Sequence, residues 1–490
     1  METKEIKESK GITLMVLVIT IIVILILAGV TISAITGDNG IIGNAGQAKE
    51  ETEIANEKEI VEKATIQAME NNKYGNVEDD ELQEQLDKEA GADKTEANDI
   101  GNQIEVVFIE SNRYYLVEKD GNVKGEYLIT EDKYPGNIIV GKDGEELNGK
   151  SETEEGGKPY EIWCIEDLVE WSQNYESYQN AYIKLGRTLN FESRLSYANG
   201  KVLNCNSIDE LRDLLTKVSG NGFTPIKNFS GTFDGQSNEI QNIYINKTGK
   251  AGLFESIDGE VIIQNIGISG NITGTGDVGS ICGTVEIYAN ATIKGCYNQA
   301  NITNEGIDDW ASAGGICGAS HLGKITIINC YNAEQSQING NMAGGILGIT
   351  KTAFDVFAIY NSFNLGEVKG KKYAGGMIAY SSNTGKCINV YTTGDIKGAE
   401  IIGGIIGGAM WDNPNGRQYD NCYFLKSSTV QQGAGRNVTV NATKLEELTN
   451  ETIDELNIYI TNNSTLTSDW KKWAIENRKP QFIEEMQTNT

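Results

Sequence analysis

Short runs in which apolar and polar residues alternate fill the middle of the chain. Each run is followed by a turn rich in glycine, asparagine or aspartate. The segment 293–297, Ile-Lys-Gly-Cys-Tyr, is typical of these runs. Alternation of this kind predicts short, half-buried β-strands. We therefore expect residues 229–425 to consist mainly of β-structure.

Two phrases recur within this segment. The first ends at residues 283, 318, 348, 379 and 407, with copies 28 to 35 residues apart. Its copies read Val278–Gly283 (VGSICG), Ala313–Gly318 (AGGICG), Ala343–Gly348 (AGGILG), Ala374–Ala379 (AGGMIA) and Ile402–Gly407 (IGGIIG). The second phrase lies between these copies, and its marks are Ile266, Cys296, Cys330, Ser362, Val390 and Cys422, at steps of 28 to 34. Because both phrases measure the same period, the segment is an array of repeated units.

A single unit has too few apolar residues for a core of its own, but stacked units can share one. We therefore predict a mainly β fold, a β-solenoid similar to a parallel β-helix, over residues 229–425. The Gly pairs would supply positive φ or close backbone approach at the corners. The alternative is an ordinary β-sandwich in which the Gly pairs are turns, although sandwiches seldom keep so regular a period.

The beginning of the chain has a different pattern. Residues 1–10 are rich in charge, whereas residues 12–35 contain no charged side chain. As a helix, the uncharged run would span about 36 Å, which is enough to cross a bilayer. We therefore expect a leader at 1–11 and a transmembrane helix at 12–35. This predicts a single-pass protein of the bacterial cell membrane, with most of the chain outside the cell.

A small α+β domain is expected over residues 36–140. Its amphipathic segment, 47–69, carries one apolar stripe, formed by Ile54, Val61, Ala64 and Ala68. Alternating runs at 105–110, 114–119 and 122–129 predict strands. The dipeptide Asp120-Gly121 between the last two is a strong hairpin signal.

The remaining segments surround the repeats. Residues 141–159 are polar and glycine-rich, which predicts a solvated linker. We expect residues 160–228 to cap the first turn of the solenoid, with helices at 165–171 and 207–219 and a strand at 181–185. Residues 426–490 would form the C-terminal cap, with a helical pattern over 442–456 and apolar bulk from Trp470, Trp473 and Phe482.

Charge and cysteine content narrow the choice of partners and chemistry. The chain has 69 acidic and 41 basic residues, a net charge of −28. A surface this acidic repels phosphate backbones, so we expect no nucleic-acid partner. Cys282 and Cys317 hold the same place in successive units, which predicts a ladder of buried thiols that behave as small apolar residues. A disulfide between adjacent turns is the alternative in an oxidising environment.

Little in the sequence supports catalysis. His321 is the only histidine, so a cluster of histidine metal ligands is excluded, and a Ser–His or Cys–His nucleophile could be built only around this residue. It lies in the turn Ser320–Gly323, where a solvated side chain is expected. The repeats also lack the aspartate that calcium-binding repeats place two residues after a glycine. We expect no catalytic residue, cofactor or metal.

Two clusters could contact a sugar. Asp308 and Asp309 precede Trp310, and Trp411 precedes Asp412. Paired carboxylates can serve as acid and base, and an indole can stack on a sugar ring. Since parallel β-helices also host polysaccharide lyases and hydrolases, a cell-surface glycan-acting enzyme of this kind is the alternative to a non-catalytic glycan contact.

The phrases Gly314–Gly318 (GGICG) and Gly344–Gly348 (GGILG) resemble the GLUG motif of bacterial surface proteins. The segment 225–245 resembles the entry segment found ahead of those repeats, and the resemblance covers residues 160–425. It implies a β-helical, extracellular architecture. Some proteins with this motif also have a metallopeptidase domain, but the His-Glu-x-x-His that such a domain needs is absent from this chain.

The segment Lys10–Leu14 resembles the type IV prepilin cleavage site, where a peptidase cuts after the glycine. This implies cleavage between Gly11 and Ile12, with other pilin-like subunits as partners. Pilins generally have Glu at the fifth mature position, where its carboxylate neutralises the amine of a neighbouring subunit. Here that position is Val16. We therefore expect the leader to be removed and the protein to remain a minor or non-filament component. The alternative is an uncleaved single-pass anchor.

These patterns favour a structural or interaction protein over an enzyme. The leading hypothesis is a membrane-anchored, pilin-like surface protein that presents its solenoid for adhesion to a glycan or protein ligand.

Overall fold

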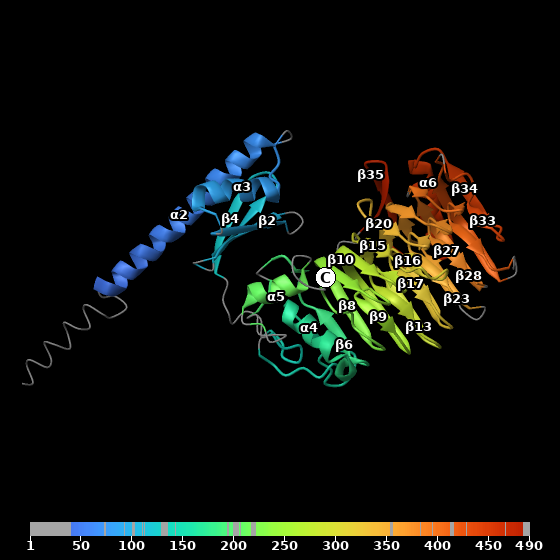
Figure 1. Ribbon diagram of the computed structural model, residues 1–490, viewed down its shortest axis with the longest axis horizontal. Coiled ribbons are helices and arrows are strands. Elements are labelled where there is room, and N and C mark those ends of the chain that lie inside the picture. The colour runs from blue at the N-terminus through green and yellow to red at the C-terminus, as the bar shows by residue number, and fades with distance from the viewer. Residues whose placement is uncertain are drawn as a thin grey trace, which may run out of the picture. The chain divides into compact units, whose positions relative to one another are not determined.

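The computed structural model describes residues 41–483, apart from 73–74, 93, 100–102, 110, 112, 129–135, 143, 194–195, 199–204, 206, 217–221, 353–355, 383, 394, 412–415, 428 and 466. The chain divides into two compact units, Met1–Ile129 and Thr130–Thr490. Figure 1 shows both, and we describe each by itself.

The predicted single-pass localisation in the membrane is corrected by the structure. In the described part of the chain, no helix is both long enough and apolar enough to cross a bilayer. The segment 12–35, on which the prediction was based, lies outside the described residues. The expected cleavage site, Gly11 and Ile12, lies outside them as well.

The first unit packs two helices against an antiparallel sheet in the order β1-β2-β3-β4. Its elements are α2 Ile41–Asn71, α3 Asp79–Ala90, β1 Thr95–Asp99, β2 Gln103–Phe108, β3 Arg113–Glu118 and β4 Val123–Leu128. The three predicted strands are confirmed within two residues at each end. Helix α3 and strand β1 were not predicted.

The apolar stripe of α2 forms much of this unit's core. Val61, Ala64 and Ala68 are fully buried, whereas Ile54 is half-buried. The predicted hairpin is present, and Gly121 has a φ of 86° between β3 and β4. Glycine adopts this left-handed conformation at no steric cost, which explains the sequence signal.

The second unit is built around a β-solenoid of about six turns. We call each turn a rung. Every rung pairs in parallel with the next, and residues about 30 positions apart lie side by side, as Ala291 does with Val261 and Ile325. The strands lie next to one another in the order of their colours, from green to red (Figure 1). The predicted β-solenoid is thereby confirmed, and the β-sandwich alternative is wrong.

Three faces surround the core. One is a seven-stranded sheet of β9 Phe254–Ile257, β12 Cys282–Val285, β17 Cys317–Ser320, β22 Leu347–Thr350, β27 Ile378–Ser381, β31 Ile406–Ala409 and β33 Ala434–Arg436. The second, which we call the glycine sheet, has five strands: β11 Val278–Gly279, β16 Ser312–Gly314, β21 Met342–Gly344, β26 Tyr373–Gly375 and β30 Ile401–Gly403.

The third face bends around a corner, because its longer strands continue through the bend. It contains β8 Thr232–Lys247, β10 Glu260–Gly274, β13 Asn290–Lys294, β14 Tyr297–Asn298, β15 Asn301–Asn304, β18 Lys324–Ile328, β19 Tyr331–Asn332, β20 Gln337–Asn339, β23 Val356–Tyr360, β24 Phe363–Asn364, β25 Glu367–Lys369, β28 Thr384–Thr392, β29 Ile396–Lys397, β32 Arg417–Leu425 and β34 Ala442–Leu445.

The register shows that one sequence unit makes one rung. Cys282 pairs directly with Cys317. The backbone N of Cys296 lies 3.4 Å from Sγ of Cys330, and the residues that follow, Tyr297 and Tyr331, are paired. All eight cysteines are buried and free, as the predicted thiol ladder requires.

Glycine and asparagine have separate roles at the corners. A Cβ on Gly344 would lie 2.0 Å from the carbonyl O of Leu347, so the Gly pairs permit close backbone approach. The left-handed conformation belongs to asparagine at another corner, with φ of 53° at Asn329 and 44° at Asn361. Asparagine tolerates this region better than most residues.

The N-terminal end of the solenoid is closed by β5 Tyr160–Ile162, α4 Ile165–Gln173, a 3₁₀ turn at Tyr175–Tyr178, β6 Tyr182–Leu185, β7 Leu189–Asn190 and α5 Ile208–Leu215. Trp171 of α4 is fully buried, and its ring contacts Phe229, Phe233 and Phe254 at centroid distances of 5.2–5.5 Å. An indole wedged among rings at such distances seals the open core.

Two segments outside the repeats, 141–159 and 442–456, differ from the predictions. The expected linker is tied into the second unit, since Gly149 bonds Lys158 and Tyr182 through the backbone. Residues 442–445 form strand β34 rather than the start of a helix. Helix α6, Asn450–Asn462, begins after Thr449, whose hydroxyl accepts from the Thr452 N–H. An N-cap threonine marks this later start, which apolar periodicity alone did not reveal. The hairpin β35 Trp473–Glu476 and β36 Lys479–Phe482 follows.

We predict that Asn361→Ala destabilises the protein more than Asn361→Gly does. Both variants lose the amide, whose loss in a buried place costs about 1–3 kcal/mol. Alanine must also adopt the left-handed φ of 44°, which costs about 1–2 kcal/mol more. Urea unfolding followed by circular dichroism measures the difference. Equal losses would show that backbone conformation contributes nothing at this corner.

A second prediction concerns Asp167, which is fully buried in α4 and accepts hydrogen bonds from the backbone N–H groups of Trp163 and Cys164. Burial raises its pKa from 3.8 to about 7 in spite of these bonds. The unfolded chain ionises first as pH rises, so this group lowers stability progressively between about pH 4 and pH 7.

Asp167→Asn should therefore gain stability relative to the wild type as pH increases through that window. Thermal unfolding at pH 4.5 and 7.5 tests this, with the exposed Asp258→Asn as control. A constant difference between the Asp167→Asn variant and the wild type would contradict the raised pKa.

Candidate functional site

The outward side of the glycine sheet carries one row of side chains. Ser312, Met342, Tyr373 and Ile401 are paired in succession through the parallel register. A second row, on the neighbouring seven-stranded sheet, consists of Ala319, Ile349 and Tyr380. The rows meet in an apolar cluster outside the main core, which we call the outer aromatic cluster: Ala319, Met342, Ile349, Tyr373, Ala379 and Tyr380, with Ile401 and Met410 packed against it.

The cluster is held together by the packing of its two tyrosines. The rings of Tyr373 and Tyr380 lie 4.9 Å apart between centroids, tilted by 57°. Gly408 makes room for one of them, because a Cβ there would lie 2.6 Å from the Tyr373 ring. Both tyrosines are buried at 7 % exposure, so the cluster itself offers a contacting molecule only a small apolar area.

Two exposed tryptophans are connected with this cluster, Trp310 by a ring contact and Trp411 by its place in the sequence. Trp310, in the loop before β16, is 39 % exposed, and its ring meets Tyr380 edge-on at 5.8 Å. Trp411 is 53 % exposed and directly follows Met410, which packs on the cluster. The structure therefore brings the Trp310 ring into contact with the cluster, and it places Trp411 directly after a residue that packs there. Asp412 lies outside the described residues.

The acidic residues beside Trp310 support the loop. Asp308 Oδ1 accepts a hydrogen bond of 2.9 Å from the Trp310 N–H, which closes a turn. Asp309 pairs with Lys372 at 3.2 Å. The side-chain amide of Asn341 donates to the backbone carbonyls of both aspartates. These carboxylates position the indole and interact with groups on the same loop and the next rung.

Sequence reasoning did not identify Met342, Tyr373 and Tyr380. A signal was present, because Met342 and Tyr373 each stand immediately before a Gly-rich phrase whose first residue faces the core. Since successive residues of a strand point to opposite faces, the residue before that position had to face outward.

His321 lies where it was expected, in the turn between β17 and β18, and it is half-buried. Its backbone N–H donates to the carbonyl of Val285 on the preceding rung. Two thiols of the ladder are fully buried. Burial raises the pKa of Cys282 and of Cys296 well above the ordinary value, which keeps both in the neutral form.

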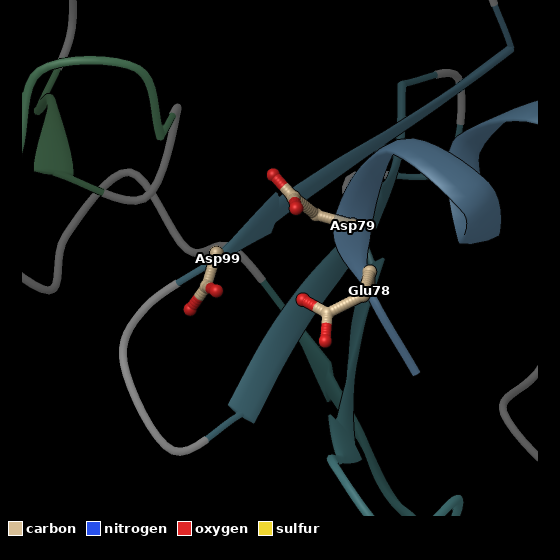
Figure 2. A group of neighbouring side chains, drawn as sticks. All are labelled: Glu78, Asp79 and Asp99. Carbon is tan, nitrogen blue, oxygen red and sulfur yellow. The ribbon is translucent and has the colours of Figure 1, made fainter. Parts of the chain in front are cut away.

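A group of carboxylates in the first unit has the geometry of a cation site. Figure 2 shows Glu78, Asp79 and Asp99, whose oxygens lie within 4.8 Å of one another. In the part of the chain that the structure describes, no other group of three acidic, histidine or cysteine side chains is this close. Lys119 contributes a positive charge, 2.6 Å from Asp99 and 3.7 Å from Glu78.

The position of this group explains its charge without a metal. Glu78 is the N-cap of α3 and Asp79 lies in the first turn. Carboxylates are stabilised there by the helix dipole. We assign no metal to the cluster.

Comparison with known proteins gives limited similarity. No family model matches the chain. Halomucin from Haloquadratum walsbyi is 32% identical over 116 residues, which are 22% of this chain. The match spans about 1% of the length of halomucin.

A crystal structure from Bacteroides ovatus, described as that of a "putative immunoglobulin A1 protease", is 19% identical in sequence. The match covers 71% of this chain and 97% of that one, with a TM-score of 0.46. Similarity at this level establishes neither family nor activity. The function must therefore be inferred from the surfaces of this chain.

Proposed function

We propose that the solenoid is a non-catalytic adhesion module of a surface protein, and that it binds a glycan at the outer aromatic cluster. The observation that carries this proposal is the exposed indole of Trp310 against one buried apolar cluster, with the exposed Trp411 directly after Met410 of that cluster. A single exposed aromatic side chain is ordinary, but one that extends an apolar cluster to the surface can anchor a partner.

A glycan suits the chemistry of this surface. An indole presents a flat apolar face to the C–H groups of a sugar, and its N–H can meet a hydroxyl. Polar groups lie next to Trp310, because Asp309, Lys372 and Asn341 surround its loop. A ligand that combines apolar ring faces with many hydroxyl groups is complementary to such a mixture.

The positions of the carboxylates favour binding over hydrolysis. Two carboxylates that cleave a glycosidic bond must flank it, about 5–9.5 Å apart, and exchange protons with substrate or water. Asp308 is engaged with the backbone of its own loop, and Asp309 with Lys372. The glycan-acting enzyme remains the alternative, and the product assay below separates it from adhesion.

Association with other pilin-like subunits is a further interaction that we propose, on the resemblance of the N-terminal segment. Its structural support is α2 of the first unit, which buries Val61, Ala64 and Ala68 against a four-stranded antiparallel sheet. A long helix packed on a small sheet by a stripe of small residues is the arrangement that the resemblance implies.

We predict that Trp310→Ala and Trp411→Ala each weaken glycan binding at least tenfold, about 1.4 kcal/mol, because each removes a stacking surface. The full chain would be screened on a glycan array, and affinities for the best glycan measured by calorimetry. Tyr288→Asn is the matched control, since Tyr288 is an exposed aromatic residue in a different turn. Asparagine also tolerates its φ of 66°.

If both tryptophan variants bind the glycan with unchanged affinity, the outer aromatic cluster is not the binding site. Release of new reducing ends or unsaturated sugars from the bound glycan would show that the protein is a glycan-acting enzyme rather than an adhesion module.

A further inference from the structure

A row of side-chain amides follows one corner of the solenoid. The equivalent positions on successive rungs are Asn265, Gly295, Asn329, Asn361, Asn389 and Asn421, and each has a positive φ. Asn329 and Asn361 are joined amide to amide at 2.7 Å, and Asn389 and Asn421 at 2.5 Å. We call this row the amide ladder.

The amide ladder already binds an extended piece of polypeptide within the same chain. Asn329 donates to the carbonyl of Asp469 at 2.6 Å and accepts from the N–H of Lys471 at 3.0 Å. Asn361 donates to the carbonyl of Lys471 at 2.8 Å. The side chains thus offer alternating donors and acceptors to a backbone, as the edge of a β-sheet does.

Aromatic side chains also attach the C-terminal segment to the solenoid. Next to the amide ladder, the rings of Tyr297, Tyr331 and Phe363 are stacked on successive rungs, at 4.9 and 4.8 Å. The C-terminal segment places two rings against this stack, Trp473 at 5.5 Å and Phe482 at 5.0 Å from the Phe363 ring. Main-chain hydrogen bonds and inserted aromatic rings together attach the segment.

The covered surface ends at a cleft of about 490 Å³. Gly295 and Asn265 of the ladder lie in its wall, Tyr297 and Tyr331 also line it, and the C-terminal hairpin bounds it at Pro480–Phe482. Glycine replaces asparagine at this rung, so the row of amides has a gap at the cleft. The volume is within the range of specific ligand sites.

We propose that this cleft binds an extended segment of a partner protein, with one aromatic side chain inserted beside Tyr297 and Tyr331. The partner would continue, towards the N-terminal rungs, the interface that residues 469–482 already make with the ladder. From Asn265 to Asn329 the ladder covers two rung spacings, about 9.6 Å, which is the length of about three extended residues.

The orientation of the rings favours a peptide over a sugar as the molecule that occupies the cleft. The rings of Tyr297 and Tyr331 are parallel within 3°, so each covers a face of the other. The Tyr297 ring also lies over Gly267, where a Cβ would approach it to 2.3 Å. The stack therefore presents ring edges to the cleft. A sugar needs an aromatic face, whereas another aromatic ring packs well against an edge.

The test uses the full chain and a fluorescent synthetic peptide, Asp-Trp-Lys-Lys-Trp-Ala, which repeats the sequence of residues 469–474. We expect binding by fluorescence anisotropy, weakened at least tenfold by Gly295→Asn. Asparagine occupies the other five rungs and accepts the left-handed φ of 64°, so this variant should fold while filling the gap. Thermal unfolding checks the fold.

Asn265→Gly provides a second variant, which removes the amide at the far end of the cleft and keeps its φ of 54° accessible. This variant should weaken the binding of the peptide severalfold. Trp310→Ala is the matched control and should leave peptide binding unchanged, because Trp310 belongs to the outer aromatic cluster. The result for the peptide is therefore independent of the result for glycans.

The peptide could instead displace the C-terminal segment from the ladder. To separate the two outcomes, the second tryptophan of the peptide is replaced with the photo-crosslinker benzoylphenylalanine. We expect photo-crosslinks to the segment around Gly295 and Tyr297. No binding, equal binding to Gly295→Asn, or crosslinks confined to residues 387–391, a segment that shares a cluster with Trp473, would each overturn the proposal. So would an oligosaccharide that binds the wild type and loses affinity in Gly295→Asn.

Discussion

Parallel hydrogen bonding between rungs in exact register is the constraint on which the solenoid depends. It places each residue directly beside its equivalent one period away, as in the column Ile263, Ile293, Ile327 and Ile359 of the core. Each side chain must then pack against the residues at the equivalent position of the neighbouring rungs. Aliphatic side chains and thiols suit the inside, stacked rings suit the outside, and amides suit a corner because each can donate to one neighbour and accept from the other.

The same constraint explains where the two proposed binding surfaces lie. A regular rung offers a partner little, since its backbone groups are satisfied by the rungs above and below. Both surfaces that we connect with function occur where the repetition changes. Trp310 lies in a lengthened loop before β16, and Gly295 interrupts a row of asparagines. Departures from a repeat are therefore the informative positions in this chain.

Much of the fold follows from periodicity. Two phrases with one period predict the stacked rungs, and the shared position of Cys282 and Cys317 predicts their direct pairing. Other features depend on contacts that no local pattern records. The hydrogen bond from Asn329 to Asp469 joins residues 140 positions apart. The sequence therefore indicates that Trp473 is an apolar residue to be buried, but not that it packs beside the amide ladder. Asp308 was a candidate glycan contact by its place beside Trp310, and its hydrogen bond to the Trp310 N–H shows that it closes a turn.

The C-terminal segment also alters how the solenoid comes apart. In a simple repeat array each rung contacts only its neighbours, and terminal rungs can peel away one at a time. Here Asp469 and Lys471 bond Asn329 and Asn361 on adjacent rungs, and Tyr459 bonds Asp420 on a later one. A load applied to the last rung is thereby shared with rungs nearer the middle. The C-terminal half should therefore yield under tension as one mechanical block.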